Sequence, residues 1–129
     1  MTTSLPSSHD DLLSAPGTAI FSTITPSGLI QSTAVWYLYD GGELKFSFSD
    51  ARKKFRNLGA NPTATAFILD PQNPFRFIEV RGTVTIEPDP DFAFRGKVAA
   101  HYGADMSGFD QPGDKRYVLT LEPSTVNAQ

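Results

Sequence analysis

Four of the 11 Lys and Arg residues in the chain fall between positions 52 and 56. Flanking residues predict a short helix over this cluster, because Ser49 or Asp50 can cap its start and Gly59 can close it in a left-handed conformation. Asn61-Pro62 prevents the helix from continuing. The dipole of a helix disfavours cations in its first turn and favours anions there. The pattern therefore indicates that an anion binds at the start of this helix.

Helical spacing of about 100° per residue separates the four cations into two pairs. Ala51, Phe55 and Leu58 fall on one apolar stripe, and Arg52 and Lys54 flank that stripe on either side. Because flanking side chains can reach across the protein surface, these two cations are the predicted anion ligands, and the other pair points into solvent. A basic face that contacts only solvent is the alternative interpretation.

The strand-like run from Gln31 to Val35 carries small and hydroxyl side chains where bulky ones are usual. Small side chains let a flat ring lie close to the backbone, whose N–H and C=O groups can bond the polar edge of the ring. Ser47 lies near the end of the next predicted strand, just before the basic helix. An ordinary half-buried strand is the alternative. Together these features predict a planar, phosphate-bearing cofactor, with its phosphate on Arg52 and Lys54.

Composition limits the other classes of function. The chain has 129 residues, 40% of them hydrophobic, which suits a single domain over 1–129 with a partly flexible segment at 1–14. Its formal net charge of −3 disfavours nucleic-acid binding, including a barrel that stacks single-stranded bases. No apolar run approaches the ~20 residues of a membrane span and no signal-peptide pattern is present, so a soluble cytoplasmic protein is expected.

Several kinds of catalytic site are also excluded by the sequence. The chain has no Cys, so disulfides and thiolate catalysis are absent. His9 and His101 lack the spacing of metal ligands, and no metal site is predicted. The sequence contains no G-x-S-x-G elbow, no Walker loop and no G-x-G-x-x-G motif.

Alternating hydrophobicity predicts a mainly β protein with six strands, mostly sequential and antiparallel. The clearest alternation runs from Arg76 to Ile86, where Gly82 in mid-strand indicates a bulge. Three helices are predicted. The first is a single turn at His9–Ser14, whose two leucines pack against the body, and the second covers the basic cluster. The third runs from Asp89, which caps it, to about Tyr102. A small closed or nearly closed barrel fits this pattern. The predicted strands are 18–24, 29–40, 43–48, 63–70, 76–86 and 116–121.

Two longer strings of residues resemble a known family. The first is Arg52-x-Lys54-x-Arg56-Asn57-Leu58, followed by Asn-Pro, and the second runs from Asp70 to Gly82 as DPQNPFRFIEVRG. They resemble the pyridoxamine 5′-phosphate oxidase-like flavin-binding split β-barrels, and most closely a branch of flavin/deazaflavin oxidoreductases, many of which use the deazaflavin coenzyme F420. True pyridoxamine-phosphate oxidases are longer and carry substrate-binding residues that this chain lacks, so vitamin B6 synthesis is not expected.

The resemblance implies a six-stranded antiparallel split β-barrel of the FMN-binding type and a homodimer with cofactor sites at the subunit interface. It implies an F420-dependent reductase that transfers hydride from the reduced cofactor to a small conjugated electrophile. An FMN-dependent oxidoreductase and a non-enzymatic flavin- or F420-binding protein are the alternatives. F420 carries an acidic polyglutamate tail, and Lys53 and Arg56 beside the phosphate pair favour it over FMN.

The family pattern also assigns site residues, without naming a catalytic one. The phosphate role falls on Arg52 and Lys54, with Lys53 as a third ligand. The candidates for the proton donor are Tyr37, Tyr39, Tyr102 and ordered water. The candidates for cofactor binding are Gln31, Ser32, Thr33, Ala34, Val35, Trp36, Ser47, Arg52, Lys53, Lys54 and Asn57.

Overall fold

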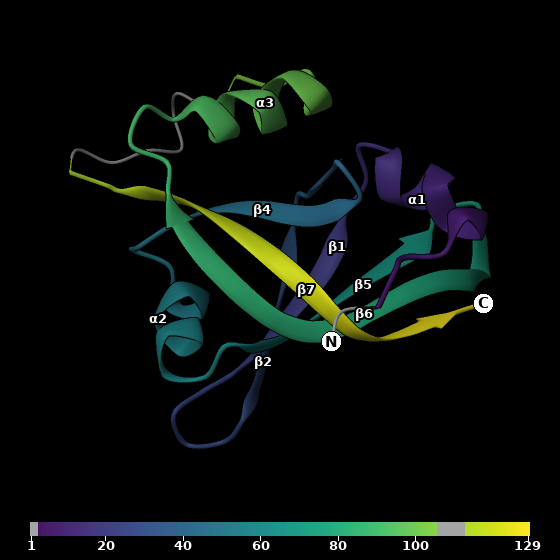
Figure 1. The fold of residues 1–129 in the computed structure, drawn as a ribbon, viewed down its shortest axis with the longest axis horizontal. Helices are drawn as coiled ribbons and strands as arrows, with labels where there is room; N and C mark the ends of the chain where they lie inside the picture. The colour runs from purple at the N-terminus through teal and green to yellow at the C-terminus, as the bar shows by residue number, and fades with distance from the viewer. Residues whose placement is uncertain (1–2, 106–112) are drawn as a thin grey trace.

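A computed structural model describes residues 3–105 and 113–129 of the chain (Figure 1). Short helices lie around one strongly curved β-sheet. In chain order, the elements are η1 (Ser7–His9), α1 (Asp10–Ser14), β1 (Ala19–Ile24), β2 (Ile30–Val35), β3 (Leu38–Asp40), β4 (Glu43–Ser49), α2 (Lys53–Ala60), β5 (Thr63–Asp70), β6 (Asn73–Pro88), α3 (Ala93–Tyr102) and β7 (Arg116–Ala128).

Within the described ranges, seven antiparallel strands form the sheet in the order β2-β1-β5-β6-β7-β4-β3. β2 and β3 lie at opposite ends of this order, although only Trp36 and Tyr37 separate them in the chain. In a flat sheet, the two edge strands would be six spacings of about 4.8 Å apart, a distance that so few residues cannot span. The sheet therefore curls into a half-barrel that brings its two edges together (Figure 1).

The predicted number of six strands is wrong, because the run Leu29–Asp40 breaks in its middle. Trp36 and Tyr37 belong to neither β2 nor β3. The side chain of Tyr37 is only 1% exposed, and its hydroxyl donates a hydrogen bond to the backbone oxygen of Leu12 (2.8 Å). This buried anchor holds the chain where it passes from one edge of the sheet to the other.

The long strand β6 contributes buried side chains to the inner face of the sheet. Its predicted alternation is confirmed, since Ile78, Val80, Gly82 and Val84 are buried and their neighbours are more exposed. The predicted bulge is confirmed as well, because the register of β6 against β7 shifts between Arg81 and Gly82. β6 and β7 both run beyond their predicted ends, because the two strands continue to pair with each other there.

The N-terminal segment is tied to the barrel over the residues that the structure describes. Leu12 and Leu13 of α1 are buried, as predicted. The Arg76 guanidinium donates two hydrogen bonds to the Asp11 carboxylate (2.7 and 2.9 Å) and one to Asp70 (3.1 Å). These hydrogen bonds, assisted by the positive charge of Arg76, lower the pKa of Asp11 to about 2.

The predicted caps of α2 are wrong at both ends. Ser49 ends β4, and the Asp50 carboxylate accepts a hydrogen bond from the backbone amide of Lys115 (3.3 Å) instead of capping the helix. Gly59 lies inside α2, which ends one residue later at Ala60. Ser49 pairs with β7 and Asp50 bonds the residue just before β7, so neither residue forms the cap that the local sequence predicts.

Asp89 does cap α3, although the helix begins three residues later than predicted. Its carboxylate accepts hydrogen bonds from the amides of Phe94 (3.1 Å) and Arg95 (3.0 Å), and Phe92 takes a left-handed conformation just before the helix. Phe94 and Val98 of α3 are buried. None of the helices in 3–105 and 113–129 has the length and apolar character that a bilayer crossing requires.

Replacing Gly82 by Ala is expected to destabilise the fold, because an added Cβ would overlap the backbone oxygen of Glu122 in β7. We expect a loss of about 1–3 kcal/mol in the free energy of unfolding, measured by urea denaturation. Gly96→Ala in α3 is the matched control, since nothing lies within 4 Å of its added Cβ. Ala there should be neutral or stabilise by up to about 1 kcal/mol. Two variants of equal stability would contradict the role of the bulge.

Candidate functional site

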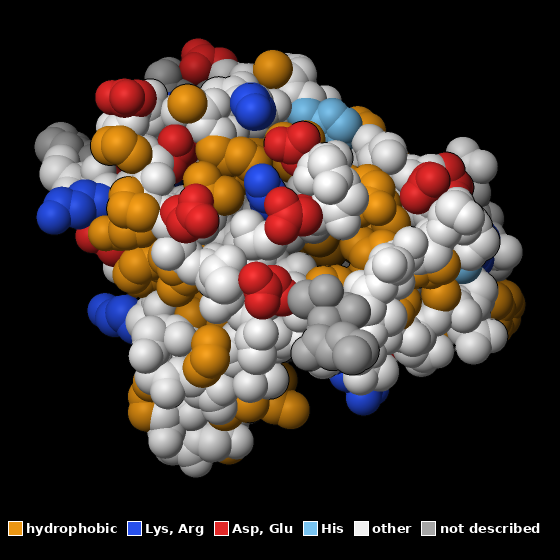
Figure 2. Space-filling view, in the orientation of Figure 1, with side chains coloured by type: hydrophobic (Ala, Val, Ile, Leu, Met, Phe, Trp, Pro, Cys, Tyr) orange, Lys and Arg blue, Asp and Glu red, His pale blue; other side chains and the backbone are white. Residues whose placement is uncertain are grey.

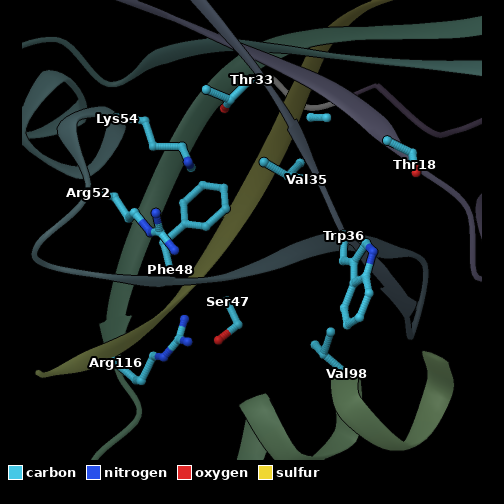
Figure 3. Close-up of a pocket in the computed structure, with 11 residues that line it drawn as sticks. Thr18, Thr33, Val35, Trp36, Ser47, Phe48, Arg52, Lys54, Val98 and Arg116 are labelled. Carbon is cyan, nitrogen blue, oxygen red and sulfur yellow. The ribbon is translucent and has the colours of Figure 1, made fainter. Parts of the chain in front are cut away.

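A cavity of about 430 Å³ lies where the two edges of the curled sheet approach each other (Figure 3). β2 and β4 form its main walls, and α2, α3 and the start of β7 complete them. Figure 3 shows cations at one end of the cavity and Trp36 and Thr18 at the other. The lining residues are Thr18, Thr33, Ala34, Val35, Trp36, Ser47, Phe48, Arg52, Lys54, Val98 and Arg116.

The basic end of the cavity combines Arg52, Lys54 and Arg116. Arg52 immediately precedes α2 and Lys54 lies in its first turn, where the helix dipole favours a bound anion. The Lys54 ammonium lies 4.7 Å from the centre of the Phe48 ring. Burial lowers the pKa of Lys54, and the neighbouring charge of Arg52 lowers it further. An anion bound between Lys54 and Arg52 would offset both the burial of the Lys54 ammonium and its repulsion by Arg52.

The basic end is a local feature of an acidic molecule. Acidic side chains are spread across the middle of the face shown in Figure 2, in keeping with the net charge of −3. The basic end is therefore a local concentration of positive charge on a molecule whose net charge is negative.

Two hydroxyl groups in the cavity are buried and have no hydrogen-bond partner in the described part of the chain. They are Oγ1 of Thr33 in β2 and Oγ of Ser47 in β4. A buried hydroxyl without a partner costs on the order of 1–3 kcal/mol, so such groups are rare in a folded protein unless a ligand or water satisfies them. Both hydroxyls line the same cavity as the three cations, and they fit a ligand with phosphate oxygens.

The opposite end of the cavity is apolar and flat. Trp36 and Val98 of α3 lie next to each other there (Figure 3), and Ala34 and Val35 add further apolar lining to the cavity. The Trp36 ring stacks on the Tyr102 ring, with centroids 4.2 Å apart and planes only 8° apart. Among the described strands, β2 is an edge strand that pairs only with β1, so its other backbone edge is available to hydrogen-bond a planar ligand.

Seven of the predicted site residues line this cavity, and four do not. Thr33, Ala34, Val35, Trp36, Ser47, Arg52 and Lys54 come together there. Ser32 lies on the outer face of β2, where its hydroxyl pairs with that of Ser22 (2.8 Å). Lys53 is exposed and does not line the cavity.

Asn57 and Gln31 contact each other beneath the site instead of lining it. The Asn57 side chain is 2% exposed, and its amide group donates to Gln31 Oε1 (2.7 Å) and to Thr23 Oγ1 (3.0 Å). These hydrogen bonds connect α2 to β1 and β2 through a buried polar network. Breaking such a network costs much free energy, because it leaves buried polar groups without partners. Asn57 therefore fixes the helix that presents Lys54, and does so from inside the barrel.

Sequence reasoning missed four lining residues: Thr18, Phe48, Val98 and Arg116. Arg116 is the most consequential, because it adds a third cation and is only 7% exposed. It enters the site through the register of β4 with β7, in which Arg116 lies opposite Ser49. Its position at the start of the last predicted strand carries no local signal for this pairing.

None of the three tyrosines considered as proton donors lines the cavity. The Tyr37 hydroxyl donates away from it, to Leu12, and burial raises the pKa of Tyr37. The Tyr102 hydroxyl donates to the backbone oxygen of Gly17 (2.6 Å) and accepts from the Tyr37 amide (3.0 Å). Across the described residues, no three His, Cys, Asp or Glu side chains gather as a metal-binding group.

Comparison with known proteins places this geometry in a family. A solved F420 reductase is 34% identical to the chain, with a TM-score of 0.86, over 97% of this chain and 100% of that one. The fold is shared at lower identity with a putative pyridoxamine 5′-phosphate oxidase from Listeria innocua (17%, 86% of each chain, TM-score 0.64). It is also shared with the heme storage protein HutZ from Vibrio cholerae (12%, 98% and 95%, TM-score 0.74).

No curated protein sequence is significantly similar to this chain. The family model described as pyridoxamine 5′-phosphate oxidase matches residues 5–129, nearly the whole chain. The half-barrel with its split edges and the long region that the family model matches both support the same family assignment. The chain therefore belongs to the pyridoxamine 5′-phosphate oxidase family.

Proposed function

We propose that the protein is a flavin- or deazaflavin-dependent oxidoreductase, and specifically an F420-dependent reductase that acts on a small conjugated electrophile. One observation carries this proposal: cations and two unpartnered hydroxyls converge at one end of a cavity whose other end is flat and apolar. A phosphate-bearing planar cofactor matches both ends at once.

Each part of the cavity has a distinct role in this proposal. Arg52 and Lys54 bind the phosphate through charge-assisted hydrogen bonds, and the hydroxyls of Thr33 and Ser47 donate to its remaining oxygens. The open backbone edge of β2 hydrogen-bonds the polar rim of the ring. Val35 and Val98 exclude water from the apolar end. When bound, the reduced deazaflavin supplies a hydride for a conjugated double bond of the substrate.

F420 is favoured over FMN by two observations. The F420 reductase noted above shares 34% identity over the full length of both chains. In addition, positive charge extends beyond the phosphate pair, through Lys53 and Arg56 on the exposed side of α2. F420 has an acidic tail that could use these charges, whereas FMN ends at its phosphate.

A cofactor-binding protein without turnover is the second candidate. The observation that favours it is that the hydroxyl groups of Tyr37 and Tyr102 donate their hydrogen bonds to backbone oxygens outside the cavity. An enzyme of this design must then obtain its proton from the solvent or from another group of the site.

We further propose that the protein is a homodimer whose second copy covers the outer face of β1, β2 and β5. This face exposes Ile20 (42%), Ile30 (77%) and Leu69 (43%), more apolar area than a solvated sheet face usually keeps. Apolar side chains are visible over the β1–β2 hairpin at the lower end of Figure 2. Ile20 lies opposite Ala34, which also lines the cavity, so a second copy on this face would extend the wall of the site.

A side-by-side titration of the purified protein with F420 and FMN tests the proposed cofactor. We expect saturable binding of F420, followed by fluorescence, at least about tenfold tighter than that of FMN. Turnover with reduced F420 over a panel of enones, imines and related electrophiles then separates a reductase from a binding protein. Tight binding with no turnover across the panel would favour the binding protein, and tighter FMN binding would reverse the cofactor assignment.

Replacing Arg52 and Lys54 together by Ala should weaken cofactor binding by at least about 2 kcal/mol, roughly thirtyfold, because two charge-assisted phosphate contacts are lost. Lys97→Ala with Lys115→Ala is the matched control, since it removes the same charge from exposed side chains that do not line the cavity. The control should cost much less than the test pair. Unchanged affinity in the Arg52/Lys54 variant, by the same titration, would show that the phosphate lies elsewhere.

Placing charges on the proposed interface should separate the subunits. We expect Ile20→Lys with Ile30→Lys to yield a monomer by light scattering where the unmodified protein is a dimer, because each lysine would be buried without a partner. Ala100→Lys, on the exposed surface of α3, is the control and should leave the dimer intact. A double variant that stays dimeric would place the interface on another face.

A further inference from the structure

One stripe of side chains joins α3 to the rest of the molecule. Phe94, Val98 and Tyr102 recur every four residues, so they share one face of the helix. Phe94 and Val98 are buried, while Tyr102 stacks its ring on Trp36 and donates its hydroxyl hydrogen bond to Gly17 (2.6 Å). Of the three, only Val98 lines the cavity. The helix is therefore held near both of its ends and presents Val98 to the cavity between them.

Val98 lies on the side of β4 that faces away from the core. Ser47 and Phe48 are adjacent in β4, so their side chains point to opposite faces of the strand. The Phe48 ring packs against Phe21 in the core, with 5.3 Å between centroids. Figure 3 shows Ser47 and Val98 on one side of β4 and the Phe48 ring on the other. The cavity is thus bounded by the core on one face of β4 and by α3 on the other.

A ring that binds the open edge of β2 has a defined orientation. The N–H and C=O groups of a strand point sideways, within the plane of the sheet. A planar ligand whose rim bonds these groups continues that plane across the split toward β4, and its two faces turn the same way as the faces of the sheet. One face then lies against Val35 and Phe48, which are buried in the core. The other face turns toward α3, and a second molecule can reach the ring only from that side.

We infer that Val98 is a specificity-determining residue, because it sets the space over the ring face on which the electrophile binds. Its side chain and the neighbouring Trp36 ring are apolar, and the cations lie at the other end of the cavity (Figure 3). The substrate is therefore a neutral, flat enone whose substituents are limited by the residue at position 98. The inference rests on the proposed function and names its substrate class.

The electron balance of this step is that of a conjugate reduction. A hydride from the reduced cofactor forms a C–H bond at the β-carbon of the enone, and a proton from the solvent completes the α-carbon. The substrate gains the two electrons that the cofactor loses. The protein contributes position alone, by holding the double bond between the ring and Val98.

Binding of two enones without turnover tests the role of Val98. A protein loaded with oxidised F420, or with oxidised FMN if that binds more tightly, has no hydride to give, so calorimetry measures enone affinity alone. We expect Val98→Ala to raise the affinity for 4-isopropylcyclohexenone relative to cyclohexenone by at least about fivefold, because it removes apolar bulk over the ring. Val98→Leu adds bulk and should lower the same ratio by at least about fivefold.

Val84→Ala is the matched control for the alanine variant. It removes the same atoms from a buried position that does not line the cavity, so the ratio of the two enone affinities should stay within about twofold. Val98→Leu leaves no void in the core and therefore still decides the question if Val98→Ala fails to fold.

The outcomes separate this inference from the proposed function. An unmodified protein that binds neither F420 nor FMN overturns the proposed function, and the inference with it. A loaded protein that binds neither enone, or a ratio that Val98→Leu does not lower, overturns the inference alone. Cofactor binding that Val98→Leu weakens by more than about threefold overturns it as well, because the ring itself would then lie against Val98.

Discussion

The structure depends on one constraint: the two edge strands of a seven-stranded sheet are joined by two residues, Trp36 and Tyr37. This link forces the sheet to curl, yet β2 and β3 do not pair with each other, so the barrel stays split along this line. Tyr37 is buried and anchored to Leu12, while Trp36 faces the cavity. The same short link that closes the fold therefore leaves open the gap in which a ligand can lie.

Several residues around this gap destabilise the folded protein when no ligand is bound. Lys54 is partly desolvated next to Arg52, and the hydroxyls of Thr33 and Ser47 are buried without partners in the described residues. Each of these features costs free energy in the isolated protein, and each would be relieved by an anionic ligand. The rest of the barrel shows the opposite pattern, with an alternating apolar core and a bulge that fits the chain to its neighbour. Local cost concentrated in one cavity indicates a binding site, because natural sequences keep such conflicts where function needs them.

Periodicity predicted the parts of the fold that depend on neighbours in sequence. The buried leucines of α1, the alternation of β6, the bulge at Gly82 and the capping role of Asp89 all follow from local rules. What periodicity could not predict is pairing between distant segments. The break at Trp36 and the entry of Arg116 into the site arise because β4 pairs with β7 and the sheet curls. The inward position of Asn57 could not be predicted for the same reason, since a polar residue on a basic helix gives no sign that it turns inward to bond Gln31.

The two ends of the cavity differ in how firmly they are held, and this difference bears on function. The basic end is built on β4 and α2, and the buried Asn57 network joins α2 to β1 and β2. The apolar end is closed by α3, which is attached through Tyr102, with its ring on Trp36 and its hydroxyl bonded to Gly17. Changes along α3 could therefore reshape the apolar end without moving the phosphate ligands. A scaffold of this kind can keep one class of cofactor and change its substrate, which is why the fold alone does not specify the reaction.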